Sequence, residues 1–133
     1  MSVAYYIVPE SEIQDFEHFV NGKALGHCDE ARLNEICEML NVQPLMEFYS
    51  EDPEELAELM EFIDGEAPTE VPPLEWFDPA DGLRTAQALI EHLTASPEAL
   101  EGSAEILDDL KEFEGVLSRL VQEKIRWYLA LDY

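Results

Sequence analysis

Apolar residues form short β-type runs at both ends of the chain. One run, at residues 2–8, stops at Pro9, and the other, at residues 125–131, mixes aliphatic and aromatic side chains. Both runs are apolar on two faces, which is typical of strands that are covered on each side. A third run at residues 42–49 also predicts a strand, and Pro44 restricts it to an edge or to a late start.

Between these runs, the apolar residues follow the three- and four-residue spacing of amphipathic helices. Serine or aspartate precedes most of these segments, as expected of helix N-caps. Residues 21–28 and 64–75, which contain glycines or prolines, are predicted to be loops. The pattern predicts helices over 11–20, 29–40, 52–63, 78–93 and 103–124, with a short helical turn after Ser96.

The predicted elements define a fold class. The chain has 133 residues, of which 47% are hydrophobic, so one domain is the expectation. Such a domain buries roughly two-thirds of its extended surface. We therefore expect a single compact α+β domain over residues 1–133. Its small sheet has about three strands, the first and last of them adjacent, and four to five helices cover it.

The chain is strongly acidic. Seven lysines and arginines stand against 31 aspartates and glutamates, which gives a net charge of −24. Proteins that bind nucleic acids or anionic membrane surfaces use clustered lysines and arginines for this purpose. Because this chain is acidic, neither is an expected partner. No apolar run of about 18 residues predicts a membrane span, and the first residues lack signal-peptide features. A cytoplasmic location is the expectation, and the oligomeric state stays open.

The acidic residues are concentrated in the middle of the chain. Residues 33–83 contain 15 acids and no lysine or arginine, and nine of those acids lie within residues 51–70. Four of the seven bases lie instead near the C-terminus: Lys111, Arg119, Lys124 and Arg126. The chain therefore has an acidic centre and an end of mixed charge.

Three interpretations of the acidic centre stay open. Glutamate on helix faces keeps a protein soluble, and an acidic surface with only three lysines also suits high salt. Alternatively, an acidic face steers a basic partner toward it. The protein would then be a non-enzymatic interaction module that resembles, as a class, small acidic immunity or inhibitor proteins that neutralise basic toxins. Its predicted partner-binding residues are Glu51, Glu54, Glu55, Glu58 and Glu61.

Two aromatic residues, Trp76 and Phe77, follow the proline-rich segment. In one interpretation they hold that segment against the core. In the other they form an exposed aromatic anchor of a binding surface, beside Glu75 and Asp78. The second interpretation adds both aromatic residues to the predicted partner-binding set.

An alternative hypothesis places a small-ligand site or an enzyme active site in the loop at residues 21–28 or beside Trp76. Lys23, His27 and Cys28 lie together in this loop. Cys28 could act as a nucleophile with a histidine as its base, and the candidates for that base are His27, His18 and His92. A zinc site would need four ligands, whereas only the pair His27–Cys28 is adjacent and Cys37 falls on an apolar stripe.

No catalytic residue, cofactor or metal site is predicted from motifs. The chain has no Gly-x-Ser-x-Gly turn and no phosphate-binding loop. The stretch 64–66 lacks the ligand spacing of a calcium loop. Cys28 and Cys37 are nine residues apart, which is about 13 Å along a helix and beyond the reach of a disulfide. Both thiols are therefore expected to be free.

Two segments in the second half of the chain carry a resemblance to a family. Residues 77–90 read Phe-Asp-Pro-Ala-Asp-Gly-Leu-Arg-Thr-Ala-Gln-Ala-Leu-Ile, and residues 107–133 hold a helix with Leu-Lys-x-Phe before a closing apolar strand. These segments, with the N-terminal strand, resemble the YfbM-like family of uncharacterised small bacterial proteins. The resemblance covers about half of the chain. It implies a compact α+β fold and implies no activity.

Overall fold

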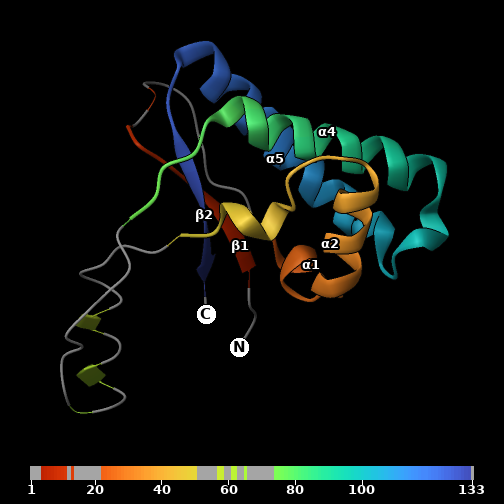
Figure 1. Cartoon of the computed structure of the whole chain (residues 1–133), viewed down its shortest axis with the longest axis horizontal. Helices are drawn as coiled ribbons and strands as arrows, with labels where there is room; N and C mark the ends of the chain where they lie inside the picture. Colours follow the sequence, from red (N-terminus) through yellow and green to blue (C-terminus); the bar gives the residue numbers. More distant parts are fainter. Residues whose placement is uncertain are drawn as a thin grey trace.

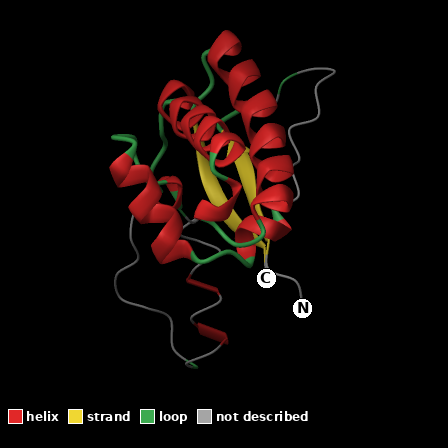
Figure 2. Cartoon of the chain, turned by 90° about the vertical axis from the view of Figure 1, so that its right-hand side faces the viewer, coloured by secondary structure: helices red, strands yellow, loops and turns green. Residues whose placement is uncertain are grey.

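The helices labelled in Figure 1 lie mainly on one side of a two-stranded sheet, which Figure 2 shows from the side of the helices. The computed structural model describes residues 4–11, 13, 22–50, 57–58, 61–62, 65 and 74–132. Within these residues, one strand opens the fold, one strand closes it, and helical elements lie between them. The protein is therefore mainly helical with a small antiparallel sheet, an α+β arrangement.

The first and last strands pair with each other. β1 (Ala4–Pro9) runs antiparallel to β2 (Trp127–Asp132), and Ile7 lies opposite Leu129. Tyr5 and Ile7 are buried whereas the residues between and beside them are half-buried, so alternate side chains of β1 face the core. The prediction that the first and last strands are adjacent is confirmed.

Three predicted helices form close to their predicted bounds. They are α2 (Glu30–Met39), α4 (Pro79–Ala95) and α5 (Ser103–Glu123). The short turn expected after Ser96 is the 3₁₀ helix η2 (Pro97–Ala99), which joins α4 to α5. α4 and α5 then pack along each other (Figure 1).

Aspartate side chains start two of these helices. The carboxylate of Asp29 accepts a hydrogen bond from the backbone N–H of Arg32 at the start of α2. Asp78 does the same for Ala80 at the start of α4, where Pro79 occupies the first helical position. Both caps satisfy donors that a helix leaves unpaired at its first turn.

The core is built around the indole ring of Trp127, which is 1% exposed. The ring stacks on Phe48 at 5.1 Å between centroids, and Phe48 meets Phe77 edge-on at 5.3 Å. Gly82 of α4 lies against the same indole ring. The first turn of α4 therefore approaches the start of β2 at a point where no side chain would fit.

The prediction of a strand over residues 42–49 is wrong. Residues 45–48 form the 3₁₀ helix η1 (Leu45–Phe48), and only Tyr49 makes a single parallel bridge to Leu129. Leu45 and Phe48, three residues apart, are both buried, and one tight helical turn directs them to the same side. The apolar residues of this run therefore belong to a buried helical turn. In the described part of the chain, the sheet has two strands.

The loop predicted over residues 21–28 contains a short helix, α1 (Lys23–Gly26). A carboxylate oxygen of Asp109, from α5, accepts hydrogen bonds from the backbone N–H groups of Ala24 at 2.9 Å and Leu25 at 3.2 Å. The N-cap residue of α1, Gly22, forms no side-chain cap. A residue 85 positions later therefore stabilises this turn, and that contact has no local sequence signal.

Other predicted segments lie largely outside the described residues. These are the helix over 11–20, most of the helix over 52–63, and most of the loop over 64–75. Within the second helix, the described residues 57, 58, 61 and 62 are helical. No helix among the described residues is long and apolar enough to cross a membrane.

Candidate functional site

The predicted acidic partner site is described only in part. Glu51, Glu54 and Glu55 lie outside the described residues, whereas Glu58 and Glu61 are exposed. The neighbouring Phe62 is 88% exposed. This part of the predicted site thus presents two carboxylates and one large apolar side chain to solvent.

A second group of exposed acids lies at the end of α2 and on η1. Glu35, Glu38 and Glu47 are exposed. Burial is the main cause that raises the pKa of the Cys37 thiol, and the charges of Glu38 and Glu47 raise it further. The elements that carry them, α2 and η1, pack against each other. We call Glu35, Glu38, Met39 and Glu47 the α2 patch, in which Met39 is 63% exposed.

Each of the four arginines pairs with a nearby acid, and Arg32 thereby offsets Glu35 of the α2 patch. Within helices, Arg32 pairs with Glu35, Arg84 with Asp81 and Arg119 with Glu123. Arg126 bonds Glu10 through two nitrogens, across the start of the sheet. By contrast, no ion pair in the described part of the chain involves these four acids: Glu38, Glu47, Glu58 and Glu61.

The two aromatic residues after the proline-rich segment have different surroundings. Phe77 packs against Phe48, and its backbone exchanges two hydrogen bonds with Trp127. Trp76 is half-buried and lies edge-on to Tyr128 at 5.1 Å between centroids. Phe77 therefore helps to hold residues 74–78 against β2. Trp76 keeps part of its ring at the surface, where its role in partner binding stays a prediction.

The alternative ligand residues lie on and after α1. Lys23 and His27 are exposed, and Cys28 is half-buried. Burial, followed by the charge of Glu30, raises the pKa of the Cys28 thiol to about 11. Because the thiolate is the reactive form, this environment opposes the nucleophile that the loop hypothesis needs.

Metal ligands do not converge in the described part of the chain. No group of three or more histidine, cysteine, aspartate or glutamate side chains there could hold a metal ion. Cys28 and Cys37 are both free thiols, as predicted. His92 is half-buried on α4, and His18 lies outside the described residues.

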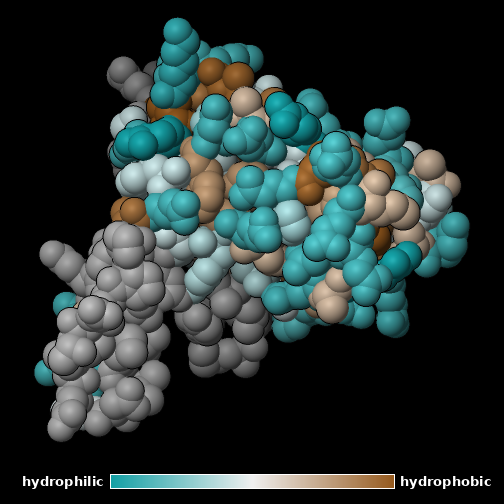
Figure 3. Space-filling view, viewed as in Figure 1, coloured by the Kyte–Doolittle hydropathy of each residue, from teal (hydrophilic) through white to brown (hydrophobic). Residues whose placement is uncertain are grey.

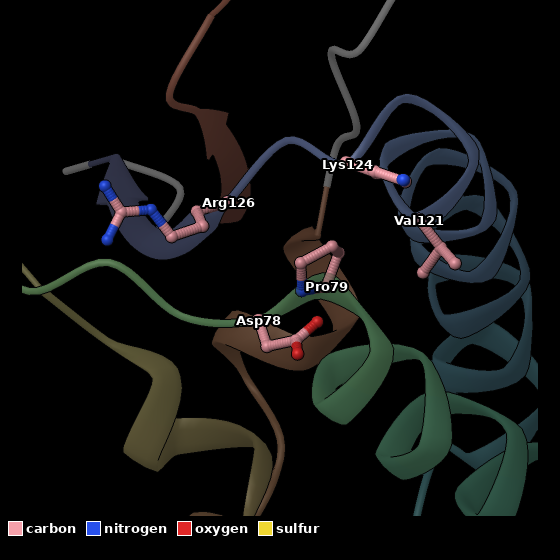
Figure 4. A pocket seen from close by; sticks show the side chains of 5 residues that line it. All are labelled: Asp78, Pro79, Val121, Lys124 and Arg126. Atoms are coloured by element: carbon pink, nitrogen blue, oxygen red, sulfur yellow. The ribbon is translucent and has the colours of Figure 1, made fainter.

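A pocket lies where α4 begins and α5 ends (Figure 4). Its volume is about 320 Å³. Asp78 and Pro79 come from the start of α4, Val121 from the last turn of α5, and two bases from the connection to β2. The lining consists of Asp78, Pro79, Val121, Lys124 and Arg126.

The sequence indicates that Lys124 and Arg126 lie in an end of the chain with mixed charge, but it gives no indication that they line a pocket. Lys124 has a left-handed backbone with φ of 58° that ends α5. This turn sends the chain back into β2, and Arg126 follows two residues later. Only the packing of α4 against α5 adds Asp78 and Pro79, so a pattern along the chain could not reveal the pocket.

No protein-family model matches the chain, and no curated protein or solved structure matches it either. The resemblance to the YfbM-like family therefore stays a prediction.

Proposed function

We propose that this protein is a non-enzymatic interaction module whose acidic surface binds a basic partner protein. The observation that supports the proposal is a set of exposed acids that form no ion pair within the described part of the chain. Glu58 and Glu61 in the central segment, and Glu38 and Glu47 in the α2 patch, have this character.

Two features favour binding over a uniformly solvated surface. Each group of acids includes an exposed apolar side chain, Phe62 in the central segment and Met39 in the α2 patch. Interfaces combine such apolar contacts with charges that steer the partner. Moreover, the last turn of α2 contains no base, although the negative end of a helix dipole favours a cation there. A lysine or arginine of a partner would supply that missing positive charge.

The experiment is capture of a basic protein from the source organism's lysate, with elution at rising salt. The first bait variant carries glutamine at Glu51, Glu54, Glu55, Glu58 and Glu61, and the second carries glutamine at Glu35, Glu38 and Glu47. A control that loses as many charges as the second variant carries glutamine at the exposed residues Glu98, Glu101 and Glu105, near the start of α5. Binding should then be reproduced with the purified partner.

The expected result is a basic protein that elutes as salt rises, because screening weakens steering between exposed charges. Loss of binding in the first or second variant, with binding kept in the control, would locate the interface. Equal retention by all baits, or no charge-dependent partner at low salt, would refute the proposal.

A further inference from the structure

The pocket between α4 and α5 has a different charge from the rest of this acidic protein. Its lining holds two bases, Lys124 and Arg126, and one acid, Asp78. We propose that this pocket binds the carboxylate group of a small ligand or chain end that carries a short apolar group. The inference is independent of the proposed binding of a basic partner.

The acids near the pocket are already engaged. The carboxylate of Asp78 accepts the backbone N–H of Ala80 at 2.9 Å. Glu10 bonds Arg126, and Glu123 lies 3.3 Å from Arg119. In the described part of the chain, no ion pair involves the ammonium group of Lys124. Of the two bases in the lining, Lys124 is therefore the one whose charge is available to an added anion.

The backbone holds Lys124 at the edge of the pocket. Its N–H donates to the carbonyl of Val121 at 3.2 Å, and the next N–H, of Ile125, donates to Leu120 at 3.0 Å. These bonds fix the turn that ends α5. In Figure 4 the Lys124 side chain extends along the end of α5 on the same side as Val121, whereas Arg126 extends on the other side of Pro79.

The charge of the lining selects a carboxylate over a more highly charged anion. Glu10 offsets the charge of Arg126, so the ammonium of Lys124 is the one uncommitted positive charge of the lining, which also holds one acid, Asp78. The guanidinium of Arg126 already gives two hydrogen bonds to Glu10, which also raise its pKa. A dianion such as phosphate would therefore meet one uncommitted ammonium and the repulsion of Asp78. A carboxylate matches the available charge and accepts from the ammonium in a charge-assisted hydrogen bond.

The apolar part of the lining and the volume define the rest of the ligand. Val121 is 36% exposed, and Pro79 is buried in the wall. A volume of about 320 Å³ lies at the lower end of the range for ligand sites. A carboxylate with a branched chain of a few carbons fits this space.

The experiment is an NMR titration of the full chain in which backbone amide shifts of residues 121–126 are followed at low salt. The probes are N-acetyl-leucine, which mimics a peptide C-terminus, and hexanoate, which is a free carboxylic acid. The uncharged N-acetyl-leucinamide and inorganic phosphate are the controls. We expect millimolar binding of at least one carboxylate and weaker binding of both controls. The preferred carboxylate then distinguishes a chain end from a small metabolite.

Variants test the residues that carry the inference. Lys124→Met should weaken carboxylate binding about fivefold or more, because it removes the ammonium and keeps the side-chain length. Lys111→Met makes the same change at an exposed position of α5 outside the lining, and it should leave binding unchanged. Glu10→Gln should strengthen binding, because it frees the guanidinium of Arg126.

Three results would overturn the inference. The first is that neither carboxylate causes larger shifts than N-acetyl-leucinamide. The second is binding of phosphate as tight as that of the preferred carboxylate, and the third is no difference between Lys124→Met and Lys111→Met. The amide spectrum of each variant reports whether it is folded, so a loss of binding through unfolding is recognised directly.

Discussion

Gly82 lies where α4 passes over the indole ring of Trp127. A Cβ atom at this position would lie 2.3 Å from Cζ2 and 2.8 Å from Cε2 of that ring. The ring has little freedom to move, because it stacks on Phe48 and its Nε1–H lies 3.4 Å from the carbonyl oxygen of Asp78. We expect Gly82→Ala to lower the free energy of unfolding by about 1–3 kcal/mol, the usual range for overpacking. Urea denaturation measures the change.

Gly115 supplies the matched control for this substitution. It is an exposed residue inside α5, and an added Cβ would meet no atom within 4 Å. Gly115→Ala should raise the free energy of unfolding by about 0.5–1 kcal/mol, since alanine favours the helix over glycine. Similar stability changes for both variants would mean that α4 does not press on Trp127.

At the scale of single residues, the sequence predicts what depends on neighbours along the chain. The starts at Asp29 and Asp78 were predictable because a capping aspartate serves an N–H two or three residues later. The contact of Gly82 with Trp127 and the pocket position of Lys124 were not predictable. Both depend on the packing of elements that are distant in sequence. A glycine or a lysine in the sequence gives no indication of which distant residue it will contact.

At the scale of elements, α1 depends on a side chain from α5. Burial raises the pKa of Asp109, the hydrogen bonds from Leu25 and Ala24 oppose this, and the charges of Glu112 and Asp108 add to it. Since its folded pKa is raised, Asp109 holds its proton more tightly in the folded than in the unfolded state. Its contribution to stability is therefore greatest below the ordinary aspartate pKa and is lost as pH rises through the raised value.

Two substitutions separate the hydrogen bonds of Asp109 from its charge. Asp109→Ala leaves two backbone donors of α1 without their acceptor and should cost about 1–2 kcal/mol. Asp109→Asn keeps an acceptor oxygen without the desolvated charge, so at neutral pH it should be at least as stable as the wild type. That advantage should shrink as pH falls toward the ordinary aspartate range. Urea denaturation across this pH range measures both effects.

The neighbouring Asp108→Asn is the control for charge alone, because Asp108 is exposed on the same helix. If Asp108→Asn and Asp109→Asn show the same pH dependence, the effect reflects the net charge of the protein and not the cap on α1.

The elements that could be predicted are those with long periodic patterns or apolar runs at the chain ends. α2, α4 and α5 repeat their apolar residues over several turns, and β1 and β2 are short and apolar on both faces. The run at residues 42–49 is too short for its period to distinguish a strand from a buried turn. α1 is shorter still, and its cap comes from another helix, so its sequence resembles a loop.

At the scale of the whole molecule, the dominant electrostatic fact is the net charge of −24. Self-repulsion of this size opposes the compact state, and salt screens exposed charges over about 10 Å at 0.1 M. We therefore expect the thermal midpoint to rise with sodium chloride concentration at constant pH. Replacing Glu51, Glu54, Glu55, Glu58 and Glu61 with glutamine should raise the midpoint at low salt and reduce its salt dependence. Differential scanning calorimetry measures both midpoints.

This measurement separates two uses of the acidic centre. Acids that serve binding cost stability in the free protein, because the partner supplies their positive charges only in the complex. The glutamine variant should then be more stable than the wild type and should also fail to retain the basic partner. If the variant is less stable at every salt concentration, these carboxylates stabilise the free fold themselves, and their role as an unpaired binding surface is excluded. Gained stability together with lost binding is the outcome that an interaction surface requires.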